Sequence, residues 1–469
     1  MKHLHTRLAG ALVALLSVCA VPHTLHAQIS NKRFAVARYS GTNGSLDKTF
    51  DGDGMLVTDF GSNSNEEIRA VAPYPGGRVV AAGAHTLISG FEWPHFAVAR
   101  YTDTGALDTT FATGGKALLT NVDGKAFAVV VQVDGKVVAG GYVWSLVTGG
   151  RFALVRLNVN GALDTTFGSG GIVITDFPSS TAEYVNALAI QTDGKIVAAG
   201  RGTSSTSGKL FALARYNTNG TLDPTFNGTG MVLTNLPLTT DEEALALTIQ
   251  PSDSKIIAAG WGQRSTGAVY VLARYNTNGT LDTTFAAGGS STMDIATTYD
   301  EAIPAVAVRN GKILAAGRGA VDVPGGCPAD GGLCHPPTTD YYLTVARYNS
   351  DGSIDTTFGS SGKALRMFGT HTSSSGGPWL AAIAITADSK FVAVGGRPEG
   401  TFPFTGVGST FELARYTSSV GLDTTFDVDG KLSTNFPSLG GEWSNAVAID
   451  PTSGKIVAAG TGGAAPVIY

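Results

Sequence analysis

The stretch ALAIQTDGKIVAAG at residues 187–200, followed by FALARY at 211–216, TLDPTF at 221–226 and MVLT at 231–234, decides the fold. Large and small apolar residues alternate in the first two segments, and a period of two residues is typical of β-strands rather than helices. An Asp-Gly step at residues 193–194 stands between two apolar runs, where it closes a two-stranded hairpin. The stretch therefore predicts four short antiparallel strands.

The same blocks recur seven times along the chain, and an aspartate that follows a leucine or isoleucine marks each copy at intervals of 56 to 73 residues. A four-stranded antiparallel unit cannot bury both of its faces alone, whereas radially stacked units bury them against one another. We therefore predict an all-β fold, a seven-bladed β-propeller of four-stranded antiparallel blades. The alternative is an open β-solenoid, which normally has a shorter and more uniform period.

The two ends of the repeat region each supply half a unit. The first block is Phe34–Tyr39 with the strand that follows it, and the last is the hairpin built from 446–449 and 455–460. If these halves pair, the first and last blades become one sheet and no edge strand stays exposed. We expect the ring to be closed by pairing of the N- and C-terminal half-blades.

The first 27 residues differ from the rest. Lys2 and Arg7 precede an apolar run from Leu8 to Val21, and Ala27 offers a small residue for cleavage. We interpret residues 1–27 as a signal peptide and 28–469 as a single propeller domain with an insertion at about 319–341. The run of 14 residues is short for the alternative, a membrane anchor, which needs about 20. Lipidation at Cys19 is disfavoured because a bulky valine precedes it.

These features predict an exported monomer, periplasmic or extracellular, with no membrane span after cleavage. The formal net charge is -5 and no basic run is present. Such a chain lacks the electrostatic footprint of nucleic-acid binding, so we expect no nucleic-acid partner.

Cys327 and Cys334 remain after cleavage, and we expect a disulfide between them in an oxidising compartment. With His335 they offer an alternative metal site, but a fourth ligand is missing. The segments 51–54 and 427–430 resemble half of a calcium loop without its distal glutamate. We expect turn acids there and no metal or other cofactor, with calcium as the open alternative.

The penultimate residue of each FALARY-like block is an arginine that stands eight residues before the marker aspartate, or nine in the first copy. A catalytic centre is needed once, so a pair that occurs in every unit favours architecture, a charged strand end held by a carboxylate. The alternative is a set of symmetric anion sites. The predicted pairs are Arg38 and Asp47, Arg100 and Asp108, Arg156 and Asp164, Arg215 and Asp223, Arg274 and Asp282, Arg347 and Asp355, and Arg415 and Asp423.

The L-D-T-T-F-G-x-G-G-K and Q-x-D-G-K-I-V-A-A-G blocks resemble the delta-60 repeat, which is found in exported bacterial proteins and associated with β-propellers. The resemblance covers nearly all of residues 34–460. It implies a bacterial repeat protein with a propeller fold. It carries no catalytic signature onto any residue of this chain.

In an up-and-down unit, the segments after the Ala-Ala-Gly strands share one face with the most variable loops. Arginine and aromatic residues there suit a carbohydrate, an anionic polymer or another protein. The alternative is that they are ordinary exposed loop residues. The candidate ligand-binding residues are Tyr142, Arg201, Trp261, Arg318 and Arg397.

We expect a non-catalytic binding scaffold, and we assign no catalytic residue. The alternative is a lyase or hydrolase with its site at the channel mouth. It would need a unique cluster that breaks the repeat. The histidines of the repeat region, His85, His95, His335 and His371, are expected in loops and have no partner visible in the sequence.

Overall fold

The computed structural model describes residues 32–61, 63–88, 93–146, 149–237, 239–295, 301–323, 338–368, 379–397, 410–437 and 439–464. The predicted signal peptide, the cysteines 327 and 334, and the histidines 335 and 371 lie outside these residues. The described part of the chain contains strands and no helices. It therefore also contains no helix with the length and hydropathy to cross a membrane.

The described strands form six sheets, all with antiparallel neighbours. Five sheets have four strands each. Their orders are β2 (Met55–Thr58), β1 (Lys32–Tyr39), β27 (Ile456–Ala464), β26 (Leu439–Ile449); β10 (Ser180–Ile190), β11 (Ile196–Ser204), β12 (Gly208–Tyr216), β13 (Met231–Thr234); β14 (Glu242–Ile249), β15 (Ile256–Arg264), β16 (Gly267–Tyr275), β17 (Ser290–Met293); β18 (Ala302–Arg309), β19 (Lys312–Val323), β20 (Thr338–Tyr348), β21 (Lys363–Met367); and β22 (Trp379–Ile385), β23 (Phe391–Arg397), β24 (Thr410–Tyr416), β25 (Lys431–Thr434).

The sixth sheet has seven strands because one long strand, β6 (Lys116–Val131), serves two units. The start of β6 pairs with β5 (His95–Tyr101) and its end pairs with β7 (Val137–Ser145). The strand order is β3 (Ser64–Tyr74), β4 (Arg78–Leu87), β5 (His95–Tyr101), β6 (Lys116–Val131), β7 (Val137–Ser145), β8 (Gly149–Leu157) and β9 (Ile172–Thr175).

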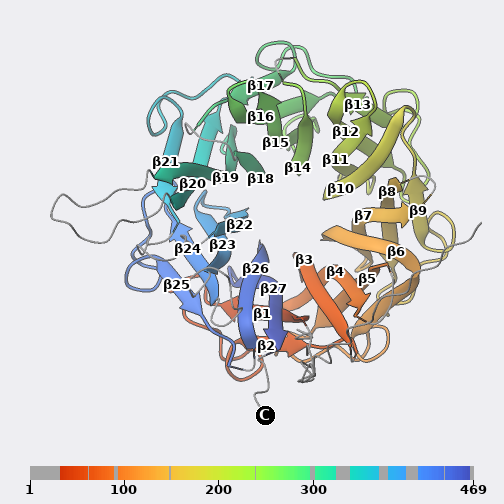
Figure 1. Ribbon diagram of the computed structural model, residues 1–469, viewed down its shortest axis with the longest axis vertical. Helices are drawn as coiled ribbons and strands as arrows, with labels where there is room; N and C mark the ends of the chain where they lie inside the picture. Colours follow the sequence, from red (N-terminus) through yellow and green to blue (C-terminus); the bar gives the residue numbers. More distant parts are fainter. Residues whose placement is uncertain are drawn as a thin grey trace, which may run out of the picture.

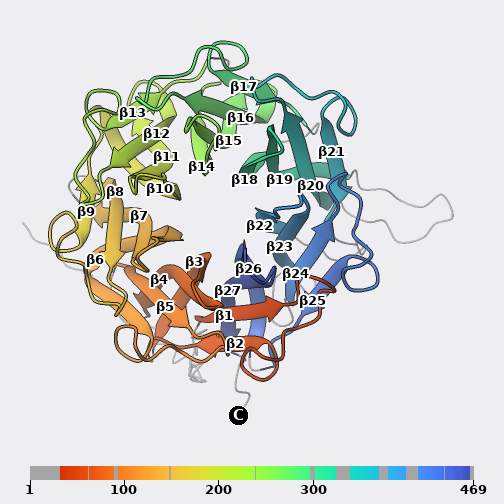
Figure 2. The ribbon, with the colours of Figure 1, turned by 180° about the vertical axis from the view of Figure 1, so that it is seen from behind.

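The sheets are arranged radially, with one strand of each unit closest to the centre (Figures 1 and 2). Within the described chain, these inner strands contact one another in the order β3, β6, β10, β14, β18, β22, β26, and β26 contacts β3 again. The first strand, β1, pairs with the last, β27, from Lys32 opposite Gly463 to Tyr39 opposite Ile456. One sheet thus combines strands from both ends of the repeat region.

The core lies between neighbouring sheets. In one such cluster, Phe211 and Leu213 of β12 pack with Ile256 of β15 and Val271 of β16, all buried. Burial of each such side chain contributes about 1.5–3 kcal/mol to stability. Alanines in the same cluster, such as Ala199 of β11 and Ala258 of β15, let the sheets approach closely.

Candidate functional site

Each inner strand carries a β-bulge at the same height. The pairing with the next strand shifts register at an equivalent point in all seven inner strands of the described chain, and β10 and β26 have a second shift near their starts. A bulge re-aims a side chain away from the regular alternation. The shift leaves Arg69, Phe127, Asn186, Leu245, Pro304, Ala381 and Asn445 between the flanking paired residues, Pro304 together with Ile303.

The bulges require the glycine of the Ala-Ala-Gly motif. A Cβ atom on Gly200 would lie 1.8 Å from the carbonyl oxygen of Tyr184 on the neighbouring inner strand. The same contact of 1.8–2.0 Å would occur at Gly83, Gly141, Gly260 and Gly460. Glycine at this position therefore lets the inner strand bend against its partner.

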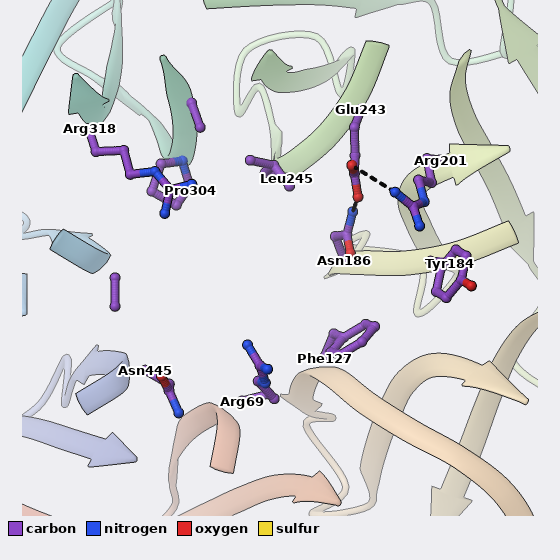
Figure 3. Close-up of a pocket in the computed structure, with 12 residues that line it drawn as sticks. Arg69, Phe127, Tyr184, Asn186, Arg201, Glu243, Leu245, Pro304, Arg318 and Asn445 are labelled. Atoms are coloured by element: carbon purple, nitrogen blue, oxygen red, sulfur yellow. Dashed lines mark hydrogen bonds and ion pairs between the residues drawn. The ribbon is translucent and has the colours of Figure 1, made fainter. Parts of the chain in front are cut away.

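All seven bulged residues line one pocket of about 430 Å³ at the centre of the molecule, which we call the central pocket (Figure 3). Five further residues complete its lining: Tyr184, Arg201, Glu243, Ala302 and Arg318. Because the bulged residues come from every unit and differ in chemistry, the pocket has no rotational symmetry.

Charges in the central pocket are held in place on one side. Arg201 Nη1 lies 3.4 Å from Glu243 Oε2, and its guanidinium group lies 4.4 Å from the centre of the Tyr184 ring. The side-chain amide of Asn186 donates to Glu243 Oε1 at 2.9 Å. Arg69 Nη2 forms a short ion pair with Glu67 Oε1 at 2.5 Å. This side therefore presents preorganised guanidinium groups beside aromatic rings.

A second cavity of about 500 Å³ continues from the central pocket and shares all seven bulged residues with it. Its wall adds apolar residues of the inner strands, such as Val129, Leu188 and Ile383, and Arg309. The bulged residues thus line both cavities.

Two of the five predicted ligand-binding residues, Arg201 and Arg318, line the central pocket. Tyr142 does not line the pocket, but its ring packs against that of the lining residue Tyr184, with 4.7 Å between the ring centres. Trp261 packs under Lys209, whose Nζ lies 5.1 Å from the ring centre. Arg397 ends β23, and its side chain lies outside the described residues.

The expectation of loop histidines was wrong for His85 and His95, which lie in β4 and β5. Both also have a carboxylate neighbour: His85 Nε2 is 3.9 Å from Glu66 Oε1, and His95 Nδ1 is 3.3 Å from Asp123 Oδ1. Neither histidine lines the central pocket. Burial raises the pKa of Glu66 to about 7, although a hydrogen bond from Ser64 opposes the shift.

The arginine and marker aspartate of each unit are adjacent. Nε and Oδ2 lie 2.7–2.9 Å apart in all seven pairs of the described chain. The arginine also covers the phenylalanine ring of the same unit, as Arg215 covers Phe226 at 4.8 Å. These pairs join a strand to a turn and lie away from the central pocket.

A cation from the hairpin turn joins each pair, which the sequence analysis missed. Lys195 Nζ, for example, lies 3.1 Å from Asp223 Oδ2. Burial alone would raise the pKa of Asp223, but hydrogen bonds from Thr225 and Lys195 and the charge of Arg215 lower it to about 2. The sequence contained a signal for this contact, because the lysine of the Asp-Gly-Lys motif recurs along the chain together with the marker aspartate. The contact between the hairpin lysine and the marker aspartate also places their two turns on one face of the molecule, opposite the end of β11 that bears Arg201.

In the two segments that resemble calcium loops, aspartates accept hydrogen bonds from backbone amides of their own turns. Asp53 Oδ1 accepts a hydrogen bond from the Met55 amide at 2.8 Å, and Asp429 Oδ1 accepts one from Lys431 at 2.9 Å. Among the described residues, no group of three or more His, Cys, Asp or Glu side chains could hold a metal ion. Calcium binding stays an untested alternative.

The chain matches the family model described as "Domain of unknown function (DUF5122) beta-propeller" at residues 132–167, 191–226, 252–285 and 340–358. Each stretch ends at the phenylalanine of the L-D-T-T-F block or of its variants L-D-P-T-F and I-D-T-T-F, and the first two also contain the Q-x-D-G-K block. A comparison with curated proteins finds no match.

Solved structures with a similar arrangement are distant. A protein of unknown function from Dyadobacter fermentans is 12% identical, with 86% of this chain and 96% of that one covered and a TM-score of 0.39. An aldose sugar dehydrogenase from Streptomyces coelicolor is 14% identical, with 84% and 94% covered and a TM-score of 0.38. The NanB sialidase of Streptococcus pneumoniae is 11% identical, with 82% and 64% covered and a TM-score of 0.35. At this level, the likeness says nothing about ligand or reaction.

The repeated motifs, the radially arranged antiparallel sheets and the four family matches lead to one conclusion: the chain is a repeat protein of the β-propeller type.

Proposed function

We propose that the protein is an exported, closed, seven-bladed propeller that binds an acidic carbohydrate in the central pocket without transforming it. Three observations support the blade count and the closure. Strand β6 serves two units, the inner strands contact one another in a cycle, and β1 pairs with β27. Counting the sheet of seven strands as two blades gives one blade per repeat.

The observation that carries the binding proposal is the convergence of three arginines, Arg69, Arg201 and Arg318, with the aromatic rings of Phe127 and Tyr184 on one pocket. A guanidinium group binds a carboxylate through two parallel hydrogen bonds, and aromatic faces pack against the apolar faces of sugar rings. Glu243 is the one carboxylate among the described lining residues, and Arg201 already neutralises it. The lining side chains carry a formal excess of positive charge, which the ion pair of Arg69 with Glu67, a residue outside the lining, offsets in part. This excess favours an anionic ligand.

The shape of the site favours a carbohydrate over a protein partner. A concave pocket of about 430 Å³ is in the range that encloses a small ligand, whereas protein interfaces are larger and flatter. The asparagine amides of Asn186 and Asn445 supply polar groups suited to hydroxyl groups. An uronic acid, alone or at the end of a chain, combines a carboxylate, hydroxyl groups and an apolar ring face.

Isothermal titration calorimetry with a short galacturonate oligomer and with its neutral galactose counterpart tests the proposal. We expect saturable binding of the acidic oligomer, and a loss of at least about tenfold in affinity on Arg318→Gln. Arg366→Gln is the matched control, because this exposed arginine of β21 lies outside the pocket. Equal affinity for both sugars, or no binding of either, would contradict the proposal.

The enzyme alternative is separated from binding by the fate of the ligand. Glu243 is held by Asn186 and Arg201, and no second carboxylate among the described lining residues stands beside it to form the pair of carboxyl groups that glycoside hydrolysis uses. Chromatography of the oligomer after long incubation with the protein should return it unchanged. Shortened or unsaturated products would replace the binding proposal by a hydrolase or a lyase.

A further inference from the structure

One contact between neighbouring units departs from the repeat at the turn before the marker aspartate. Six copies have a glycine three residues before this aspartate, each with positive φ between 77° and 91°. The seventh copy has Val420, with φ at 64°. A β-branched residue rarely adopts this backbone conformation. The six glycines are Gly44, Gly105, Gly161, Gly220, Gly279 and Gly352.

The glycines allow the turn to lie on the preceding unit. A Cβ atom on Gly279 would lie 2.8 Å from the ring of Phe226, and one on Gly352 would lie 2.7 Å from Phe285. With this close approach, a backbone amide just past the phenylalanine donates to the next turn, as Asn227 does to the Asn278 carbonyl at 2.6 Å. The glycine therefore closes the contact between two units.

Val420 carries a side chain at the position where the glycines of the other turns have none. Its side chain is fully buried in the same cluster as Phe358 of the preceding unit. Among the described residues, the amide of Gly359 has no counterpart of the bond that Asn227 makes. The valine thus acts as a wedge between the unit of β18–β21 and that of β22–β25.

The wedge exposes an arginine. In the other six units, Nη1 of the strand arginine donates to a backbone carbonyl of the following unit. Arg347 donates through Nε to Asp355 and through Nη2 to Thr357, and its Nη1 has no acceptor in the described part of the chain. Its side chain is 28% exposed, against 1–7% for the other six.

A pocket of about 390 Å³, which we call the lateral pocket, lies at this contact. Three cations line it, Arg309, Lys312 and Arg347, together with the hydroxyl groups of Ser389, Ser418 and Ser419. Arg309 is fixed across the contact by a hydrogen bond from its Nε to the Thr386 carbonyl at 3.0 Å.

The charge of the lateral pocket is positive. Two carboxylates lie nearby: Asp388 lines the pocket, and Asp355 accepts from Arg347 and Lys312. One cation is therefore left in excess. A free guanidinium donor, an ammonium group and hydroxyl donors on one concave surface suit an oxygen-rich anion.

We propose that the lateral pocket, held open by Val420, binds a phosphate group between Arg347, Lys312 and the Ser418–Ser419 turn. The ligand is either free phosphate or a phosphate monoester, since both present the same oxygens. The lateral pocket shares no lining residue with the central pocket, although Arg309 also lines the second cavity that continues from the central pocket.

Isothermal titration calorimetry of the purified protein with inorganic phosphate and with methyl phosphate, at low ionic strength, tests the proposal. We expect saturable binding of at least one of the two, and whichever binds identifies the source. Val420→Gly should fold, because six other turns carry glycine, and should lower the affinity by at least about tenfold by letting the contact close. Arg347→Lys keeps the charge beside Asp355 but loses the forked donors, and it should weaken binding as well.

Two controls separate this site from general charge effects. Arg366→Gln removes one positive charge from the same unit, and Arg318→Gln alters the central pocket; both should leave phosphate binding unchanged. No saturable binding of either probe would overturn the proposal, and so would unchanged affinity in folded Val420→Gly. Because Arg318→Gln is the variant that tests the central pocket, failure at one site is distinguishable from failure at the other.

Discussion

The hydroxyl group of Tyr39 donates a hydrogen bond of 2.9 Å to Oγ1 of Thr434, a residue 395 positions away in the sequence. In three other units of the described chain, the tyrosine at the same position makes the equivalent bond to a threonine of the unit before it, as Tyr275 does with Thr234 at 2.8 Å. The same type of contact that joins successive units along the chain thus also joins β1, the first strand, to the unit of β22–β25.

Tyr39→Phe should therefore lower the free energy of unfolding by about 1 kcal/mol, since it removes one buried hydrogen bond and leaves Thr434 without that partner. Tyr275→Phe is the matched control within the chain and should cost a similar amount. Chemical denaturation followed by fluorescence measures both. If Tyr39→Phe leaves the free energy of unfolding unchanged while Tyr275→Phe lowers it, the contact between Tyr39 and Thr434 is not formed in solution.

Deletion of residues 32–39 removes β1 and should have a larger effect than any single substitution. The strand contributes buried Phe34 and Val36 and pairs with β27 along its whole length. We expect a loss of cooperative unfolding and a fall in Tm of many degrees, measured by calorimetry. An unchanged Tm would show that the pairing of β1 with β27 adds no stability.

The buried aspartates predict a stability that falls in acid. Hydrogen bonds and positive charge lower the pKa of Asp223 to about 2, from 3.8. The folded state therefore favours the ionised form, and this stabilisation is complete above pH 4 and is lost as the pH falls from about 4 to about 2. Asp223→Asn should lower Tm at neutral pH, and its difference from the unaltered protein should shrink over that range. A constant difference at every pH would contradict the shift.

Glu66 predicts the opposite slope. Burial raises its pKa to about 7, from 4.5, so the folded state favours the neutral form and loses stability as the pH rises from about 4.5 to about 7. Glu66→Gln mimics the neutral form and should raise Tm at pH 8 while changing little at pH 4. A variant that is less stable than the unaltered protein at pH 8 would show that Glu66 is ionised and well compensated, for example by nearby His85.

The repeat could be predicted from the sequence because alternation and turn chemistry are local properties. The spacing of arginine and marker aspartate also pointed to a pair, since both residues lie beside one turn. The third member, a cation such as Lys195, was missed because it stands about 30 residues earlier. Its approach depends on how the hairpin returns across the sheet.

The central pocket could be predicted only in part. Arg201 and Arg318 lie on strands with regular alternation, so their position beside the channel could be inferred. Asn186 and Leu245 lie at bulges, where the period of two residues that underlies such inference breaks down. Trp261 follows the same motif as Arg201, but it does not line the central pocket, and Lys209 lies over its ring. Its role in binding stays a prediction.

The bulges themselves give the last prediction. Gly200→Ala places a Cβ atom against the Tyr184 carbonyl, at 1.8 Å without rearrangement, so the inner strand must move. We expect a loss of roughly 1–3 kcal/mol in the free energy of unfolding, as for other overpacked sites. Gly61→Ala is the control, because nothing lies within 4 Å of its Cβ position and its φ is not in the left-handed region. It should change stability by less than about 0.5 kcal/mol.

Because Asn186 and Tyr184 both move with the strand, Gly200→Ala should also weaken binding in the central pocket, while phosphate binding in the lateral pocket stays intact. Equal loss at both pockets would indicate general unfolding rather than displacement of one bulge.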